Sequence, residues 1–478
     1  MNSSDLLVPE RTPAASINVG TESADPTEST SSESGFLGHP RGLAYIVFTE
    51  AWERFSFYGM QALLVLYMAG HLLRSGTVEH VIGFKAFQTA TQAIFGSLSP
   101  QAFASQVFGL YVGLVFFVPV LGGLLGDRLL GRRRAVVSGA LIMALGHFLM
   151  AVEAAFLIAL LALILGSGLL KGNLAAQVGG LYAKADPRRD AAFSIYCLGI
   201  NTGAFVAPLV CGTLGEIYGW HYGFGAAGVG MLISIAIYLG GSRYLPPDVA
   251  IAGKTKGEGV QPGDTRTILA LLGVLAITAL YWIPQTQVWN TYALWVRDRV
   301  DRGVLDLTIP VTWFQSIDFV AVVALAPLVL WFWGRQARRA AEPDDLSKIA
   351  IGCAVFAASC VWLTLGELFA GAHRVALVWP LLFHLTGACA YLYAGPIMLG
   401  LISRAAPASV NAMMVGGYYL AIFAGGVGSG WLGRFYERLP AQTFWFMHGA
   451  IAAVGAVLLL ILQRPLRRTL KLSSAGTD

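Results

Sequence analysis

Twelve long apolar runs constrain this chain more than any other feature. A membrane-spanning helix needs roughly 20 mostly apolar residues, and twelve runs reach that length. They cover residues 42–70, 105–129, 134–155, 157–183, 190–217, 222–245, 268–298, 309–334, 347–370, 374–403, 409–434 and 441–463. Several contain proline or glycine, which a membrane helix tolerates where neighbouring helices satisfy the freed backbone groups. The sequence therefore predicts an all-α membrane protein that crosses the bilayer twelve times.

Composition supports a membrane protein and argues against other classes. The mean hydropathy is +0.64 and only 12% of the residues are charged, half of the roughly 25% that is typical of soluble domains. The net charge of +5 is spread over short segments between the runs, so no nucleic-acid-binding face is expected. The five cysteines lie in apolar runs without a CxxC pair, and we predict no disulfide, metal or cofactor.

Polar segments divide the chain into five parts. The N-terminal stretch is rich in Ser, Thr, Glu, Asp and Pro and is expected to be disordered. It lacks the basic start of a signal peptide, so the first run is expected to stay as an anchor. A central linker with Pro, Gly and charge separates six runs from six, the pattern of a two-bundle transporter. The predicted parts are a tail at 1–40, a bundle at 41–245, a linker at 246–267, a bundle at 268–465 and a tail at 466–478.

The positions of Lys and Arg predict the orientation. If the N-terminus is cytoplasmic, the cytoplasmic segments hold roughly 22 of the 32 Lys and Arg residues and the opposite segments about 8. Arg54 and Lys171 remain inside runs. This asymmetry predicts a multi-pass protein of the plasma membrane, in bacteria the inner membrane, with both termini in the cytoplasm.

The first run carries ionisable residues in the stretch "TEAWERFSFYG". At 100° per residue, Glu50, Glu53, Arg54, Phe57, Tyr58 and Gln61 fall within a sector of about 140°. Charges inside a membrane helix cost about 2.5–3.5 kcal/mol each and usually face a cavity. A structural ion pair between Glu50 and Arg54 is the alternative, but it leaves one carboxylate in surplus.

Lys171 is the second cation inside a run, in "GSGLLKGN". If it meets the first run, the charges of Glu50, Glu53, Arg54 and Lys171 sum to zero. Protonation of one glutamate would then free a cation for a substrate carboxylate, which is a physical route from a proton gradient to anion binding. The alternative is that Lys171 extends to a membrane interface.

Four segments together resemble a known family. The segment "GGLLGDRLLGRRR" resembles the GxxxDRxGRR loop of the major facilitator superfamily, although it also fits a plain positive-inside stop signal. The segment "EAWERFSFYG" is similar to the ExxERFxYYG signature of the proton-coupled oligopeptide transporters within that superfamily. "LLKGN" and "FSIYCLGINTGAFVAPLVCG" resemble the fourth- and fifth-span motifs of these transporters.

The resemblance implies a major facilitator fold and a proton-driven symporter of di- and tripeptides that works by alternating access. Proton coupling would fall to Glu50, Glu53, Arg54 and Lys171, and Asp127, Arg128 and Arg132 would form a conformational latch. Taking the chain's own departures from the family into account, the predicted substrate-binding residues are Arg54, Phe57, Tyr58, Gln61, Phe116, Lys171, Asn201, Trp282, Gln285, Asp318 and Tyr391. The expected partners are a small peptide, protons and the lipid bilayer, and the protein is expected to be a monomer.

The second half departs from the family pattern. In "YWIPQTQ", Gln285 and Thr286 stand where acids are expected, and "AYLYAGP" puts Tyr391 where relatives hold the peptide amino group with Glu. Asp318 is a candidate substitute, with a solvated position near the non-cytoplasmic end as the alternative. Glu367 and His384 are interpreted as packed or lipid-interface groups.

Several functions therefore stay open at this point. The first is a proton-coupled symporter of short peptides or peptide-like compounds. A carrier of a non-peptide carboxylate, modified peptide or natural product on the same scaffold is the alternative, and a non-transporting peptide receptor is a third. No nucleophile or metal-spaced ligand set supports an enzyme.

Overall fold

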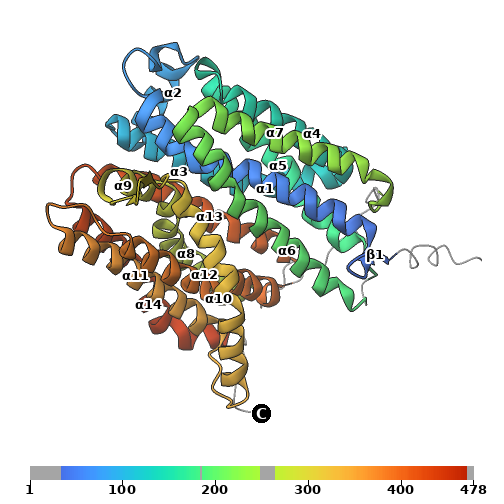
Figure 1. Ribbon diagram of the computed structural model, residues 1–478. Helices are drawn as coiled ribbons and strands as arrows, with labels where there is room; N and C mark the ends of the chain where they lie inside the picture. Colours follow the sequence, from blue (N-terminus) through green and yellow to red (C-terminus); the bar gives the residue numbers. More distant parts are fainter. Residues whose placement is uncertain (1–33, 184–185, 248–263, 408, 471–478) are drawn as a thin grey trace, which may run out of the picture.

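Two bundles of six helices make up most of the computed structural model, which describes residues 34–183, 186–247, 264–407 and 409–470. The N-terminal bundle contains α1 (Arg41–Tyr67), α3 (Pro100–Leu125), α4 (Arg132–Leu149), α5 (Phe156–Gly180), α6 (Arg188–Ala207) and α7 (Trp220–Gly240). The C-terminal bundle contains α8 (Asp264–Thr286), α10 (Trp313–Ala337), α11 (Asp345–Ala370), α12 (Val378–Ala405), α13 (Asn411–Leu432) and α14 (Ala441–Leu470). The N-terminal bundle occupies the upper half of Figure 1 and the C-terminal bundle the lower half.

These helices follow the predicted runs in order. Within the described residues, nine helical segments are long and apolar enough to cross a membrane. The other bundle helices are α1, α4 and α13. α1 carries Glu50, Glu53 and Arg54, and α4 begins with three arginines, so their sequences are less apolar. The capping chemistry is visible at α3, where Ser99 accepts a hydrogen bond from the amide of Ala102 at 3.2 Å.

Helices pack closely where glycines of neighbouring helices meet. α1 packs against α6 and α7, and α11 packs against α12 and α14. α3 crosses between the bundles and lies along α13. A Cβ atom at Gly109 of α3 would lie 2.9 Å from the backbone nitrogen of Gly430 on α13. Because no side chain fits there, the two backbones approach as closely as small-residue membrane interfaces allow.

Polar contacts join the two bundles at one end of the molecule. We call the end where α1 finishes, near α2 (Phe84–Phe95), the α2 end, and the end where α1 begins the terminus end. At the α2 end Glu216, which follows α6, accepts hydrogen bonds from the backbone amides of Val311 and Thr312, both at 2.9 Å. Trp313 at the start of α10 donates to the Thr213 hydroxyl at 2.8 Å. Polar bonds therefore join the two bundles at the α2 end.

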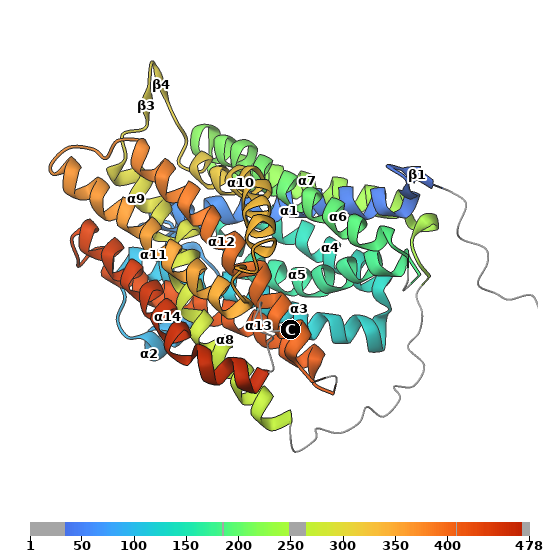
Figure 2. The ribbon, with the colours of Figure 1, turned by 90° about the horizontal axis from the view of Figure 1, so that it is seen from below.

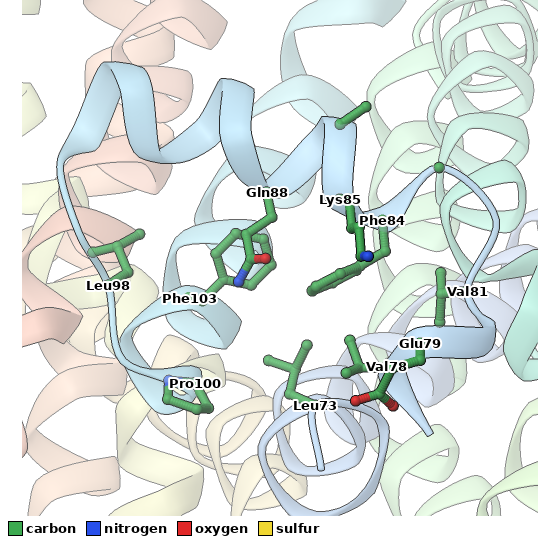
Figure 3. A pocket seen from close by; sticks show the side chains of 12 residues that line it. Leu73, Val78, Glu79, Val81, Phe84, Lys85, Gln88, Leu98, Pro100 and Phe103 are labelled. Atoms are coloured by element: carbon green, nitrogen blue, oxygen red, sulfur yellow. The ribbon is translucent and has the colours of Figure 1, made fainter. Parts of the chain in front are cut away.

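Two further features were not predicted from the sequence. α2 lies in the connection between α1 and α3 and covers a hollow of about 460 Å³ lined by Leu73, Val78, Phe84 and Phe103, among others (Figure 3). The predicted seventh run, 268–298, is not one helix. α8 ends at Thr286, a 3-10 turn η8 (Gln287–Trp289) follows, and α9 (Thr291–Arg299) begins after Asn290.

Four short strands form two hairpins outside the bundles. β1 (Ser34–Phe36) pairs with β2 (His39–Pro40) before α1, and β3 (Gly303–Val304) pairs with β4 (Leu307–Thr308) between α9 and α10. Figure 2 shows the β3–β4 hairpin projecting beyond the helices. The bundles and not these hairpins carry the candidate site.

Candidate functional site

The ionisable residues of α1 form one buried group. The Nε atom of Arg54 lies 2.8 Å from Glu50 Oε1 and 2.7 Å from Glu53 Oε2. Glu53 is 0% exposed and Glu50 is 2% exposed. α6 packs closely against this group at Gly203, which has no side chain. A Cβ atom at Gly203 would lie 3.1 Å from Arg54 Cβ. One guanidinium therefore serves two carboxylates, and the group by itself carries a surplus negative charge.

Lys171 of α5 meets α1 through aromatic rings. Its Nζ atom lies 3.7 Å from the centre of the Phe57 ring and 5.2 Å from that of Phe116 on α3. The ammonium is buried and makes no hydrogen bond to the described residues, so Lys171 does not extend to a membrane interface. A desolvated cation–π contact contributes about 2 kcal/mol, against a desolvation penalty of several kcal/mol per ion. The structure thus leaves a buried cation without a direct anionic partner, next to an anionic group.

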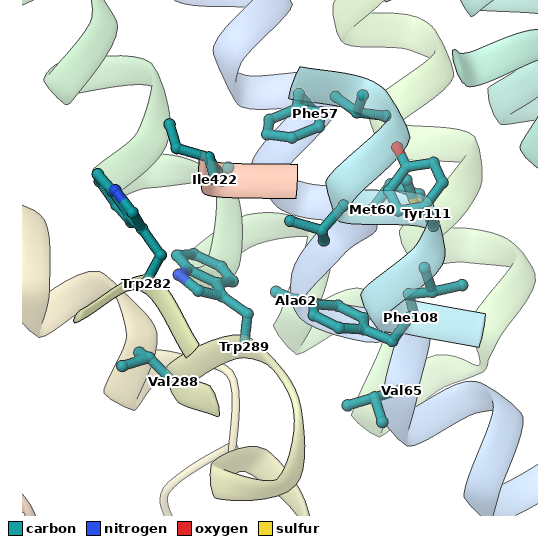
Figure 4. Packing of buried hydrophobic residues seen from close by; sticks show 14 of the residues in the cluster. Phe57, Met60, Ala62, Val65, Phe108, Tyr111, Trp282, Val288, Trp289 and Ile422 are labelled. Atoms are coloured by element: carbon teal, nitrogen blue, oxygen red, sulfur yellow. The ribbon is translucent and has the colours of Figure 1, made fainter. Parts of the chain in front are cut away.

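Aromatic rings from both bundles surround the adjacent Tyr58. Its ring centre lies 5.3 Å from that of Trp289 in η8 and 4.9 Å from that of Phe319 on α10. Figure 4 shows Trp289 and Trp282 of the C-terminal bundle on the side that faces the α1 residues Phe57 and Met60. The buried Gln61 has an Oε1 atom without a hydrogen-bond partner among the described residues. Trp289 was missed in the sequence because it lies in the turn that interrupts the seventh run.

Asp318 and His384 form a pair in the C-terminal bundle. His384 Nδ1 lies 2.5 Å from Asp318 Oδ1, and His384 Nε2 lies 2.8 Å from the Tyr292 hydroxyl. His384 is 0% exposed, whereas 19% of the Asp318 side chain is exposed. The alternative of a fully solvated Asp318 is therefore wrong, and so is a lipid-interface position for His384. The pairing joins α9, α10 and α12, which no local sequence pattern could indicate.

The remaining predicted C-terminal residues are neutral. Gln285 and Tyr391 are half-buried, and Trp282 is buried with an indole Nε1 that has no hydrogen-bond partner among the described residues. Thr286, at the second position where an acid was expected, donates to the carbonyl of Trp282 at 2.7 Å. The C-terminal side of the candidate site therefore has no carboxylate at the positions where the family pattern has one.

Asn201 on α6 forms a hydrogen bond within its own helix. It is half-buried, and its Nδ2 atom donates to the carbonyl of Cys197 on the same helix at 2.8 Å. In the C-terminal bundle, the amide of Gln287 is buried: its Nε2 lies 3.0 Å from His448 Nε2 on α14 and donates to Ser429 O on α13 at 3.0 Å. Gln287 follows directly after the two positions where acids were expected, so its place in the sequence could have marked it as a candidate site residue, but it was not among the predicted ones.

Glu367 is an ion-pair partner. Its Oε2 lies 2.8 Å from Arg299, and its Oε1 accepts from the indole of Trp295 at 2.5 Å. Glu367 is buried, so the lipid-interface interpretation is wrong and the packed interpretation holds. This ion pair fastens α9 to α11 near the α2 end.

The predicted latch lies at the terminus end, where α3 is followed by α4. The side chains of Asp127 and Arg128 lie outside the described part of the structure, and Arg132 begins α4. The neighbouring Arg133 donates to the carbonyls of Ser242 at 2.5 Å and Leu245 at 2.8 Å. The described contacts therefore tie the start of α4 to the segment after α7.

Comparison with known proteins decides the family. A family model described as POT family matches residues 133–254 and 248–430, more than half of the chain. The chain belongs to the POT family. The sequence resemblance to the proton-coupled oligopeptide transporters is thereby confirmed.

Full-length relatives within the POT family are transporters and not enzymes. The peptide transporter YePEPT of Yersinia enterocolitica is 28% identical over 91% of this chain and 96% of its own length. The di-/tripeptide transporter of Lactococcus lactis subsp. cremoris is 26% identical over 91% of this chain and 97% of its own length. The uncharacterised transporter YclF of Bacillus subtilis is 29% identical over 92% and 96% of the two chains.

Solved structures confirm the fold. The crystal structure of peptide transporter POT in complex with sulfate has a TM-score of 0.80 and 26% identity, covering 91% of this chain and 96% of that one. A variant of peptide transporter POT in complex with alafosfalin has a TM-score of 0.80 and 27% identity, with the same coverage. The predicted major facilitator fold, with twelve membrane helices in two six-helix bundles, is therefore correct.

Proposed function

We propose that this protein is a proton-coupled symporter of di- and tripeptides or peptide-like carboxylates. The observation that carries the proposal is the ammonium of Lys171, which is buried, lacks a hydrogen-bond partner among the described residues and lies beside the Glu50–Arg54–Glu53 group. A buried cation without a partner is costly, and a substrate carboxylate would relieve that cost. The POT family membership and the named relatives support a peptide as the source of this carboxylate.

The charge balance gives the coupling mechanism. With both glutamates ionised, Glu50, Glu53, Arg54 and Lys171 sum to zero. Protonation of Glu53, the more buried glutamate, leaves a net charge of +1, which a carboxylate at Lys171 and Arg54 neutralises. Proton and carboxylate then cross together as a neutral set, since an uncompensated charge in the membrane interior is expensive.

Aromatic and amide groups would shape the rest of the substrate site. Phe57 and Phe116 hold the ammonium of Lys171 in place. Gln61 Oε1 and Trp282 Nε1 have no hydrogen-bond partner among the described residues, so they and Tyr58 would bind polar groups of the substrate. Asn201 on α6 of the N-terminal bundle completes the proposed set together with Gln285, Asp318 and Tyr391 on the C-terminal side. Asp318 is the acid in this set and would take the amino group that Tyr391 cannot neutralise.

A second candidate function is transport of a non-peptide carboxylate, a modified peptide or a natural product. It is favoured by the neutral residues Gln285, Thr286 and Tyr391, which stand where acids were expected. Such substrates would need the cation of Lys171 but no carboxylate on the C-terminal side.

The proposal includes the arrangement in the membrane. A monomer would sit in the bacterial inner membrane with both termini in the cytoplasm. The bundles at 41–245 and 268–465 would move relative to each other around the substrate. The linker at 246–267 would connect them, and the tails would cover residues 1–40 and 466–478. Asp127, Arg128 and Arg132 would act as the latch at the cytoplasmic end. The charge distribution of the sequence supports this orientation.

Uptake into proteoliposomes tests the function. With an inward proton gradient, labelled dialanine is expected to accumulate above its external concentration, and a protonophore should abolish the accumulation. Uptake of a non-peptide carboxylate without any uptake of dialanine would overturn the peptide assignment and favour the second candidate.

A further inference from the structure

An apolar groove between the two bundles has no part in the proposed transport mechanism. It has a volume of about 420 Å³ and lies towards the α2 end, where α6 runs beside α10 (Figure 1). Phe205 on α6 and Leu209 in η5 (Pro208–Gly212), the π-helical turn that continues α6, form the wall from the N-terminal bundle. Phe314 and Ile317 on α10 and Leu381 on α12 belong to the wall from the C-terminal bundle.

The polar side-chain groups in the lining of the groove already have partners. The hydroxyl of Ser316 donates to the carbonyl of Phe205 at 2.8 Å, and the indole of Trp313 donates to the Thr213 hydroxyl at 2.8 Å. A polar ligand would give up its hydrogen bonds with water in this groove and find no side-chain partner in return, which is unfavourable. The groove therefore suits an apolar occupant, which a peptide backbone is not.

The groove continues the lipid-facing surface of the protein. Val320 and Leu381 line it and are exposed, as is Val210, the neighbour of Leu209. Trp313 is exposed as well, and its position at the start of α10 fits the aromatic belt that marks the boundary between membrane and water. The groove therefore opens into the bilayer just inside this boundary, at the depth of the lipid acyl chains.

Two guanidinium groups adjoin the groove. Arg302 donates through Nη1 to the carbonyl of Ile309, a lining residue, at 2.7 Å, and its Nε has no hydrogen-bond partner among the described residues. Burial lowers the pKa of Arg302, Glu216 opposes this, and the guanidinium of Arg374 lowers the pKa further. Arg374 is exposed and precedes the lining residue Leu377 by three positions. An anion beside these two arginines would relieve their repulsion.

The groove exists because the α2 end is closed. Its two walls belong to different bundles, and the hydrogen bonds of Glu216 and Trp313 join these bundles nearby. At Gly212 a Cβ atom would collide with the side chain of Thr312, so the bundles touch directly here. Any opening of this end separates the walls. A ligand in the groove therefore binds the closed conformation more tightly and shifts the balance towards it.

We infer that this groove binds one acyl chain of a phospholipid, whose phosphate lies against Arg302 and Arg374, and that the bound lipid stabilises the conformation closed at the α2 end. A phospholipid combines the apolar chain that the groove accepts with the anion that the arginines favour, and the bilayer supplies it at the open side of the groove. The inference concerns control of the conformational balance by the membrane and does not depend on which substrate is carried.

Photo-crosslinking tests the site. The purified full-length protein in detergent receives about one equivalent of a phosphatidylglycerol with a diazirine in one acyl chain, so that lipid without a binding site disperses into the micelles. Mass spectrometry is expected to find the label in residues 205–209 and 314–320. Leu209→Trp fills the groove and should lower this label by about fivefold or more, whereas Val210→Trp, at the exposed neighbouring position, should leave it within about twofold.

Two further variants complete the comparison. Leu381→Trp fills the groove from the other bundle and replaces Leu209→Trp if that variant does not fold. Arg302→Gln should lower the label by about three- to tenfold, and unchanged labelling would overturn the contact with the phosphate. Equal labelling of Leu209→Trp and Val210→Trp, or label spread evenly over exposed faces such as that of α14, would overturn the site.

Spin labels at the exposed positions Tyr222 and Phe369, near the start of α7 and the end of α11, test the conformational effect. Adding dioleoyl phosphatidylglycerol to delipidated protein should lower the share of long distances. Dihexanoyl phosphatidylglycerol, which has the same headgroup but short chains, should not. An unchanged distribution with the long-chain lipid bound would overturn the stabilisation of the closed conformation. Failure of peptide uptake would remove the proposed function and leave this inference standing.

Discussion

The two bundles divide the ionisable groups unequally. The N-terminal bundle holds four buried charges, of which the Lys171 ammonium has no hydrogen-bond partner among the described residues. The C-terminal side of the candidate site has one acid, Asp318, which already contacts His384, and otherwise aromatic and amide side chains. One bundle is thus built with an unsatisfied charge, and the other with a satisfied one.

The difference indicates that the N-terminal bundle couples transport to the proton gradient and that the C-terminal bundle selects among substrates. A charge left without a partner can respond to a proton and to an anion, which is what coupling requires. A paired acid discriminates among ligands, since only a substrate with a cationic group can use it. If this view is right, changes in the N-terminal bundle should affect all substrates alike, and changes in the C-terminal bundle should affect only those with a free amine.

Glu53→Gln should have the largest effect. Glutamine imitates the protonated acid and cannot release a proton, so the gradient loses its point of entry. Accumulation of both dialanine and N-acetyl-dialanine should disappear, whereas exchange of internal for external peptide should remain. The measurement is proteoliposome uptake with and without a gradient, beside counterflow. Gradient-driven accumulation by this variant would contradict the coupling role.

Lys171→Ala should have the second-largest effect. Hydrogen bonds to charged groups contribute roughly 1.5–3 kcal/mol, so affinity for any carboxylate substrate should fall by about 10- to 100-fold. Calorimetry or competition for uptake measures the loss for dialanine and N-acetyl-dialanine. Lys85→Ala, at an exposed position on α2, is the matched control and should bind normally. A loss confined to the free-amine peptide would reverse the proposed assignment of the bundles.

Asp318→Asn should separate the bundles most clearly. The amide keeps the size of the side chain but cannot neutralise an ammonium, so dialanine affinity should fall by about tenfold and that of N-acetyl-dialanine by less than about twofold. Parallel binding curves for the two peptides provide the test. Unchanged binding of dialanine would remove Asp318 from the site.

Glu216→Gln should have the smallest effect. It weakens the charge-assisted bonds to Val311 and Thr312 that hold the bundles together at the α2 end, and should shift the balance of conformations by a few-fold. Spin labels at the exposed positions Tyr222 and Val378, near the starts of α7 and α12, would report a larger share of long distances. An unchanged distance distribution would show that the other contacts at this end suffice.

The sequence predicted the parts of this structure that depend on local pattern. The helix runs follow from hydropathy, and the polar face of α1 follows from the spacing of Glu50, Glu53 and Arg54. Contacts between segments that are distant in the sequence could not be predicted from local patterns. His384 lies 66 residues from Asp318 in sequence, and Lys171 meets α1 through Phe57 and α3 through Phe116, and not through a carboxylate. α2 is short and amphipathic, which a search for long apolar runs does not detect.

The most direct test of the coupling mechanism measures protons and substrate together. Proteoliposomes that contain a pH-sensitive dye receive labelled N-acetyl-dialanine, so that the amino-group site does not contribute, and internal acidification is recorded beside uptake. The account predicts proton entry in a constant ratio to peptide entry, and loss of both with Lys171→Ala. Peptide accumulation without internal acidification would contradict the claim that the buried charges of the N-terminal bundle exchange a proton for a carboxylate partner.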